Sequence, residues 1–254
     1  MATDSDNYQL IENHGVIGNM RTAAVVAVDG KIDFFCYPSF DSPTIFASLL
    51  DAEKGGCFRI DPQIEGVRYK QMYLPDTNIL LSRYLSGTGV AEVTDFMPVQ
   101  AGDEPSLHSD QIVRIVRVVK GSVIFKVRCS PRFDYARSSH RTEMRNGGVC
   151  FHPENTSLSS MALFSTAPLA VDGLDAVADF TLQKGEQASF AFGCLKNEEL
   201  EIDLLAPERV QECFQQTTRF WKEWIAQSAY KGRWREIVNR LSRRGIAVTA
   251  TQLV

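Results

Sequence analysis

The 254-residue chain lacks several features that would assign it to a functional class at once. It contains no apolar run near the ~18 residues that a membrane helix needs, so we expect no membrane span. The 27 Lys and Arg residues against 31 Asp and Glu give a net charge of −4, which provides no basic field for nucleic acid. The N-terminus, MATDSDNYQL, has neither the basic nor the apolar segment of a secretory signal, so a cytoplasmic location is predicted.

Motifs for metals, cofactors and common catalytic sites are also missing. The six cysteines form no CxxC pair, and the four histidines never fall four residues apart. The sequence has no GxSxG, HExxH, P-loop or GxGxxG motif. We therefore expect no metal and no cofactor, and we interpret the cysteines as small buried apolar residues in a reducing compartment.

What the sequence does contain, from about residue 20 to 195, is a succession of strand-like runs. The Asp-Gly pair at 29–30 separates two β-rich runs and is a strong hairpin signal. In the run at 111–120, alternate residues face opposite sides, and both sides are largely apolar, as in stacked sheets. One side carries Ile112, Arg114, Val116 and Val118, and the other carries Val113, Ile115, Arg117 and Val119. The fold predicted is mainly β: a large antiparallel β-sandwich followed by a C-terminal linker-helix region.

From Pro207 the pattern becomes helical. Pro207 and Glu208 suit a first helical turn. A four-three-four-three spacing then places Val210, Phe214, Thr217, Trp221 and Trp224 on one helix face. A second helical piece is predicted over 231–240. The predicted parts are a sandwich domain over 1–205, linker helices over 206–240 and a divergent tail over 241–254.

The stretch CYPSFDSPTIFASLL, residues 36–50, marks a change of pattern after a strand. Ser42 and Pro43 fit a helix N-cap and first helical position, which predicts about two helical turns over 44–50. Asp41 just before them is either a loop residue or a functional carboxylate. Other carboxylates in predicted loops are Asp33, Asp95, Asp103 and Asp134, and each is expected to be a cap, a turn residue or an arginine partner rather than a catalyst.

Several motifs together resemble a known family. The segment NHGVIGNMRTAAVVAVDGKIDFFCYPSFDSPTIFASLLDAEKGGCFRIDP resembles the opening of glycoside hydrolase family 15 proteins of the glucoamylase, glucodextranase and trehalase-like type. SPRFDYAR at 130–137 resembles a second family segment, and FWKEWI with YKGRWREIVNR resembles the approach to the family's helical domain. The resemblance runs from about residue 8 to 240. Phe34-Phe35 departs from it conservatively, since tryptophan is usual there.

The resemblance implies an N-terminal β-sandwich that precedes an (α/α)6 barrel. It also implies that the general acid and general base are two glutamates of the barrel, so we expect no catalytic residue in this chain. The run after Arg240 shows no sustained helical stripe, and we interpret it as a truncation of the gene product or gene model. An α-glucoside or trehalose-type sugar would be the substrate of the complete enzyme.

Two sets of residues are candidates for contacts in such an enzyme. Phe40, Asp41 and Ser42 form the candidate rim of the sugar pocket, since rings stack on sugars and carboxylates accept hydroxyl hydrogen bonds. Phe214, Trp221, Trp224 and Trp234 are the candidates for docking the barrel, and this helix face is expected to promote self-association if it is uncovered. The alternatives are a self-standing carbohydrate-binding or interaction module and, less favoured, an enzyme that uses carboxylates of the sandwich.

Overall fold

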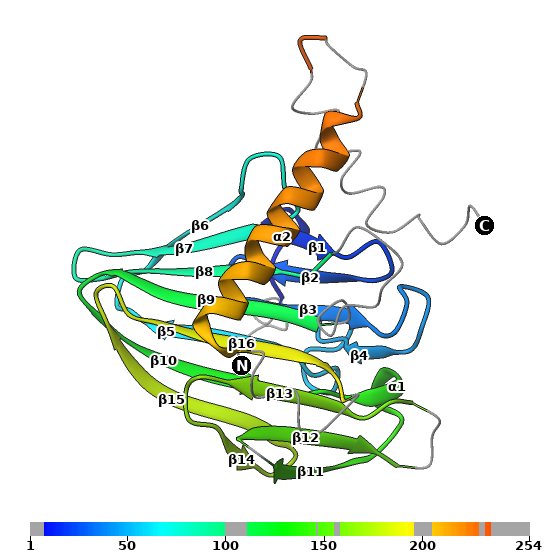
Figure 1. The fold of residues 1–254 in the computed structure, drawn as a ribbon. Coiled ribbons are helices and arrows are strands. Elements are labelled where there is room, and N and C mark those ends of the chain that lie inside the picture. The colour runs from blue at the N-terminus through cyan, green and yellow to red at the C-terminus, as the bar shows by residue number, and fades with distance from the viewer. Residues whose placement is uncertain are drawn as a thin grey trace.

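A computed structural model describes residues 8–99, 111–145, 147–154, 158–195, 205–228 and 232–234. Two eight-stranded sheets stack face to face, and all strand pairs in them are antiparallel (Figure 1). The predicted mainly β, antiparallel sandwich is confirmed. Among the described residues, no helix combines the length and apolar character required to cross a membrane.

The first sheet combines the strands that precede residue 64 with three later strands of the chain. Its strands, in spatial order, are β1 (His14–Gly18), β2 (Ala23–Ala27), β3 (Lys31–Cys36), β5 (Phe58–Gln63), β10 (Ser122–Cys129), β15 (Asp175–Gln183) and β14 (Ala170–Asp172), with β4 (Thr44–Phe46) paired to β3. The Asp-Gly hairpin is confirmed: β2 and β3 pair on either side of Gly30, whose φ of 88° is a conformation that glycine adopts without strain.

The second sheet is built largely from consecutive hairpins. Its strands, in spatial order, are β11 (His140–Arg145), β12 (Gly148–Pro153), β13 (Met161–Ser165), β16 (Gln187–Cys194), β9 (Gln111–Lys120), β8 (Val90–Phe96), β7 (Leu80–Leu85) and β6 (Arg68–Tyr73). Helical elements among the described residues are the 3-10 turn η2 (Ile11–Asn13), the short α1 (Phe133–Ala136) and the 20-residue α2 (Pro207–Ala226).

Aromatic side chains hold the two sheets together. The ring centroid of Phe192 on β16 lies 5.0 Å from that of Phe46, 6.5 Å from that of Phe35 and 6.3 Å from that of Phe58, all on the first sheet. All four side chains are fully buried. Burial of each contributes on the order of 2 kcal/mol relative to exposure, so this cluster is a main source of the attraction between the sheets.

A buried arginine also crosses the interior. Arg114 on β9 pairs with Asp95 on β8, and both side chains have zero exposure. Its guanidinium also donates to the carbonyl oxygens of Phe58 and Gly30 on the opposite sheet, each at 2.8 Å. The predicted alternation of β9 therefore holds, because Arg114 lies on the interior face together with Ile112 and Val116.

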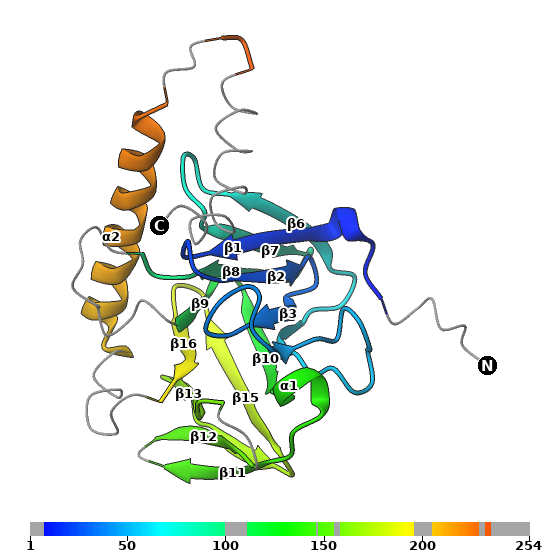
Figure 2. The same ribbon diagram turned by 90° about the vertical axis from the view of Figure 1, so that its right-hand side faces the viewer.

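Helix α2 covers part of the outer face of the second sheet (Figures 1 and 2). Its N-terminal half packs on apolar residues of that face, and the rings of Phe214 and Phe96 meet edge to face at 5.8 Å. The second apolar side of β9, with Val113 and Ile115, thus contacts a helix. The start of the helix at Pro207 is confirmed.

The buried face of α2 is rotated slightly from the predicted one. Val210, Cys213, Thr217, Trp221 and Ile225 are its buried residues. Phe214 and Trp224, which the spacing placed on that face, are half-buried at its margins. The reason is that a spacing of three or four residues fits two adjacent stripes of a helix, and packing on the sheet decides between them.

The predicted helix over 44–50 is wrong. Thr44–Phe46 forms β4, which pairs with Phe35 and Cys36 and is fully buried, and turns follow it. A β-branched and aromatic triplet beside an open strand edge gains more from pairing and burial than from a short isolated helix. The predicted helical piece over 231–240, apart from turn residues 232–234, and the tail over 241–254 lie outside the described residues.

Candidate functional site

Three segments that are far apart in sequence meet at one end of the sandwich. They are residues 19–22, 37–43 and 131–137, which follow β1, β3 and β10, and together we call them the loop end. The backbone N–H of Phe40 donates to the Arg21 carbonyl at 3.1 Å, and the Arg132 N–H donates to the Ile45 carbonyl at 2.8 Å. The loop end lies on the right of Figure 1 and faces the viewer in Figure 2.

The first segment is a tight turn organised by Asn19. Its side-chain oxygen accepts from the backbone N–H groups of Arg21 at 3.1 Å and Thr22 at 3.0 Å. These bonds support Met20 at a positive φ of 71°, a conformation that non-glycine residues seldom adopt. The Thr22 hydroxyl donates to the Cys36 carbonyl at 2.6 Å, which connects this turn to the end of β3.

The second segment contains the predicted pocket-rim residues. Ser42 closes the loop, since its hydroxyl accepts from the Ser39 N–H at 3.1 Å and its own N–H donates to the Ser39 carbonyl at 3.1 Å. Phe40 is half-buried and Asp41 is exposed. Burial, with a smaller contribution from the Asp41 carboxylate, raises the pKa of the Cys36 thiol to about 11, so this thiol is neutral and unreactive at neutral pH.

The third segment has a left-handed backbone. Asp134, Tyr135 and Ala136 have φ values of 52°, 57° and 61°, although none is a glycine. Such a conformation costs roughly 1–2 kcal/mol for each residue. The Arg137 guanidinium pairs with the Asp134 carboxylate at 2.7 Å and lies 5.3 Å from the centre of the Tyr135 ring. The turn therefore displays a ring and two charges.

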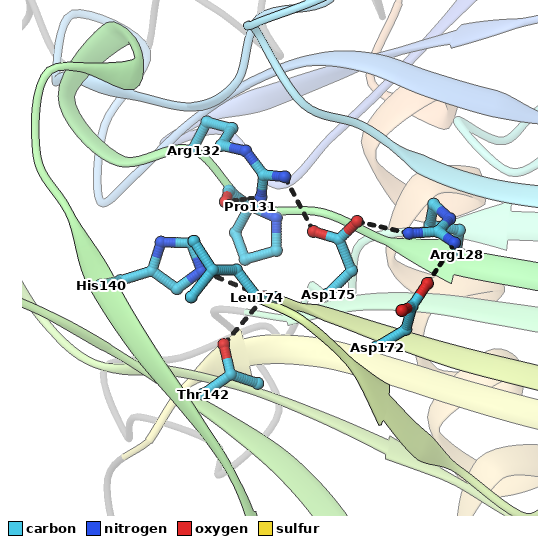
Figure 3. A network of polar contacts seen from close by, with 8 residues as sticks. All are labelled: Arg128, Pro131, Arg132, His140, Thr142, Asp172, Leu174 and Asp175. Carbon is cyan, nitrogen blue, oxygen red and sulfur yellow. Dashed lines mark hydrogen bonds and ion pairs between the residues drawn. The ribbon is translucent and has the colours of Figure 1, made fainter.

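A charged network anchors the base of this turn (Figure 3). Asp175 accepts from Arg128 at 2.6 Å and from Arg132 at 2.9 Å, and Arg128 also pairs with Asp172 at 2.7 Å. Burial opposes ionisation of Asp175, but the hydrogen bonds from the two arginines lower its pKa. The ionised carboxylate holds Arg132 in place, one residue before the buried Phe133.

His140 lies beside the same network. Its ring packs edge to face on Phe133 at 5.4 Å and on Phe151 at 6.0 Å, and its Nε2 lies 3.1 Å from the Leu174 carbonyl oxygen. Burial lowers the pKa of His140. A neutral imidazole that donates to a backbone carbonyl has a structural role here, connecting β11 to the start of β15.

The chemistry of the loop end suits binding rather than proton transfer. Asp41 is exposed and Asp134 is paired with Arg137, so neither is a buried acid of the kind that protonates a leaving group. Asp33 and Asp95 are buried in strands with His14 and Arg114 as partners, and Asp103 lies outside the described residues. The described residues contain no group of three His, Cys, Asp or Glu side chains that could hold a metal ion.

A family model described as trehalase-like, N-terminal, matches residues 4–190, which include the whole loop end. The chain belongs to the trehalase-like N-terminal domain family. All three motif segments of the loop end therefore lie within a domain of this family, and the family recognised from the sequence is confirmed at this level.

Relatives of this trehalase-like domain are named as trehalases. The chain is 29% identical to a trehalase of Thermoplasma volcanium over 239 residues, covering 92% of this chain and 37% of that protein. It is 30% identical to trehalase 1 of Sulfolobus acidocaldarius, a match that covers 83% of this chain and 34% of that protein. It is 24% identical to a trehalase of Mycolicibacterium smegmatis, a match that covers 95% of this chain and 38% of that protein. The chain thus spans little more than a third of the length of these relatives.

A solved structure described as a kojibiose phosphorylase from the human microbiome is similar to this domain with a TM-score of 0.48 and 6% identity. The similarity covers 81% of this chain and 35% of that one.

The other set of predicted contact residues lies on and after α2. Trp221 is fully buried, while Phe214 and Trp224 are half-buried and Trp234 is 53% exposed. The ring of Trp224 stacks on that of Phe220 at 6.1 Å, and the Arg233 guanidinium lies 4.6 Å from the Trp234 ring centre. Helix α2 packs on the outer face of the second sheet, whereas the predicted rim residues follow β3 of the first sheet, so the two sets do not form one site.

Sequence reasoning missed the left-handed turn and its charged anchor. The turn contains no glycine, so nothing in the letters SPRFDYAR indicates a positive φ. The anchor joins residues that are more than 40 positions apart. Only the arginine-rich spacing of Arg128 and Arg132 could have suggested an acidic partner.

Proposed function

We propose that this chain is the N-terminal accessory domain of an enzyme that acts on an α-glucoside such as trehalose. The enzyme would be of the glycoside hydrolase family 15 type, with its catalytic carboxylates in a following helical domain. The names of the relatives and the third of their length that the chain spans support this proposal. The six cysteines, all free and four of them buried, support the proposed cytoplasmic location.

The observation that carries the functional proposal is the convergence of three motif segments at the loop end. Their accessible groups are the half-buried Phe40 and the exposed Asp41 and Tyr135, which supply rings and a hydrogen-bond acceptor that suit a sugar. In our proposal the loop end forms part of the rim of the substrate pocket, with Asp41 accepting from a sugar hydroxyl. The separation of domains is proposed near residue 205, supported by the end of β16 at Cys194 and the start of α2 at Pro207.

A chimera tests the rim role. This chain would replace the N-terminal third of the Thermoplasma volcanium trehalase, and kcat and KM for trehalose would be measured. Loss of a hydrogen bond to a charged group costs roughly 1.5–3 kcal/mol, so Asp41→Asn should raise KM by about tenfold or more. The matched control is Glu65→Gln, an exposed loop carboxylate that follows β5 at the opposite end of the sandwich.

If the Asp41→Asn and Glu65→Gln chimeras have the same KM for trehalose, Asp41 has no role at the rim. The purified 254-residue chain should itself release no glucose from trehalose or maltose. Release of glucose by this chain would instead favour the alternative of an enzyme that uses carboxylates of the sandwich.

We also propose that the C-terminal part of α2 and the turn at 232–234 dock the helical domain. Trp224 and Trp234 carry this proposal, because Trp221 is already buried and Phe214 packs on Phe96. If these rings are uncovered, the isolated chain should self-associate. Sedimentation velocity across a concentration series measures this, with Trp224→Gln and Trp234→Gln expected to reduce association. A monomer at all concentrations would contradict it.

A further inference from the structure

The two sheets come close together along one side of the sandwich, away from the loop end. There β1 is the edge strand of the first sheet and β6 the edge strand of the second, and Figure 2 shows them next to each other. The Tyr73 hydroxyl bridges them, since it accepts from the Val16 N–H at 2.7 Å and donates to the Val16 carbonyl at 3.0 Å. A groove of about 460 Å³ lies beside this bridge, and we call it the edge groove.

Alternate side chains of β6 form one wall of the edge groove. Tyr69, Gln71 and Tyr73 share the face of β6 that is directed toward the first sheet. Tyr73 holds β1, and the Gln71 amide nitrogen donates to the Val26 carbonyl at 3.3 Å. Tyr69 has no such role: its ring meets the buried Tyr84 edge to face at 5.7 Å, and it is 45% exposed.

The opposite wall comes from η2 and is rigidly placed. The ring of His14 fixes this turn, because its Nδ1 donates to the Leu10 carbonyl at 2.9 Å and its Nε2 lies 2.9 Å from an Asp33 oxygen. Glu12 and Asn13 line the groove from this turn. The wall is therefore preorganised by a buried contact that none of the proposed roles uses.

Several polar groups of the edge groove are unused. Among the described residues, the side chains of Glu12, Asn13 and Lys70 have no hydrogen-bond or ion-pair partner, and neither does the Tyr69 hydroxyl. Lys70 lies on the opposite face of β6 from Tyr69, Gln71 and Tyr73, so the unpaired charge on the groove side is the Glu12 carboxylate. A concave site with a partly exposed ring, an amide and a carboxylate that accepts hydrogen bonds matches a polyhydroxy ligand without negative charge, rather than a phosphate or an acidic peptide, which the carboxylate would repel.

A second groove on this molecule provides a contrast. It has a volume of about 710 Å³ on the outer side of β5, β10 and β15, and its polar lining consists of charged residues such as Arg59, Lys126 and Asp179. No aromatic residue lines it. The larger groove therefore offers no stacking surface, and the smaller edge groove is the better saccharide site.

We propose that the edge groove binds a neutral saccharide, with Tyr69 as the stacking platform and Glu12, Asn13 and Gln71 as hydrogen-bonding groups. The choice of an α-glucoside as the saccharide rests on the proposed function. The site is separate from the loop end: η2 precedes β1 and residues 19–22 follow it, so roughly 20 Å of strand lies between them. It would hold a second part of a chain-like substrate, or a sugar that is not hydrolysed.

The test is calorimetric titration of the 254-residue chain with trehalose and maltose. Tyr69→Ala should weaken binding about tenfold, as truncation of an aromatic anchor does at other binding sites. Glu12→Gln should weaken it severalfold, and since Glu12 is exposed this variant keeps the fold. The matched control is Met144→Ala, because Met144 is 49% exposed and lies on β11, at the opposite edge of the second sheet from β6. A further variant, Tyr135→Ala, reports any sugar that binds at the loop end instead. Thermal melting of each variant shows whether it is folded.

Each possible outcome of this titration either supports or overturns the proposal. Weaker binding by Tyr69→Ala and Glu12→Gln with unchanged binding by Met144→Ala supports the edge groove. The proposal is overturned if the wild-type chain binds no sugar. It is also overturned if Tyr69→Ala and Glu12→Gln both bind sugar as tightly as the wild type does. Loss of binding in Tyr135→Ala alone also overturns it, and moves the sugar to the loop end. None of these results depends on the KM of the chimera, so failure of this inference and failure of the proposed function are distinguishable.

Discussion

Replacing Arg114 by methionine should be among the most destabilising single changes in this protein. The guanidinium is fully buried and makes four hydrogen bonds. Two go to the Asp95 carboxylate, at 2.7 and 3.2 Å, and two go to the carbonyls of Phe58 and Gly30. It also lies 4.8 Å from the centre of the Phe58 ring. Methionine fills a similar volume but donates no hydrogen bond, so the variant separates the polar contribution from packing.

The expected loss of stability follows from the groups that Arg114→Met leaves without a partner. Asp95 would be left as a buried carboxylate without its partner, which costs about 3–5 kcal/mol in comparable buried pairs. Two carbonyls would also lose a hydrogen bond, although both are backbone groups that take part in other pairing. We therefore expect a loss of about 4 kcal/mol, a large fraction of the ~5–15 kcal/mol that stabilises a typical domain.

Urea denaturation followed by tryptophan fluorescence measures this loss. The double variant Arg114→Met/Asp95→Leu should recover several kcal/mol relative to the single variant, because it removes the orphaned charge. Arg114→Lys should lie between wild type and methionine, since an ammonium cannot form the bidentate contact. A loss below about 1 kcal/mol in Arg114→Met, or a double variant less stable than the single one, would refute the reasoning.

Three further perturbations test the third segment of the loop end and its surroundings. Ala136→Gly should raise the free energy of unfolding by about 0.5–1 kcal/mol, because glycine relieves the positive φ at some cost in chain entropy; a decrease in urea midpoint would contradict this. Asp175→Ala should lower the free energy of unfolding by about 1–3 kcal/mol, after allowance for solvent screening of its arginine partners. Because the pKa of Asp175 is lowered in the fold, the difference in stability from wild type should shrink as the pH falls below 3.8. His140→Phe should reduce the pH dependence of the melting temperature. Burial lowers the folded-state pKa of His140 below 6.5, so the wild type loses stability as the pH falls through 6.5. If the melting temperature of the variant fell as steeply with pH as that of the wild type, burial of His140 would not be the cause.

Regular hydrogen bonding and hydrophobic alternation made much of the fold predictable. The strand β9 could be assigned because its alternation extends over ten residues, and helix α2 because an apolar stripe follows Pro207. The segment after Cys36 could not be assigned correctly. Its Ser-Pro pair is compatible with a helix start, and only the open edge of β3, a tertiary feature, makes Thr44–Phe46 a strand.

The candidate site was predictable only in part. The sequence identified Phe40, Asp41 and Ser42 as a loop, and the structure places them in one. It could not show that Ser42 is occupied in closing that loop, which leaves Asp41 and Phe40 as the groups with free surface. Nor could it bring Tyr69 near Glu12, because that proximity depends on where two sheet edges meet.

The left-handed turn at 134–136 indicates that the shape of the loop end serves a contact with another molecule as well as the fold. Three non-glycine residues at positive φ cost roughly 3–6 kcal/mol together, and a glycine at any of them would lower that cost. The interior offsets the strain locally, because Phe133 is fully buried and Arg132 is held by Asp175. Strain of this kind persists only where the surroundings impose it, and it is most often found where a surface must have a fixed form. The fixed display of Tyr135 and Arg137 is therefore better explained by a contact made at the loop end than by the needs of the sandwich.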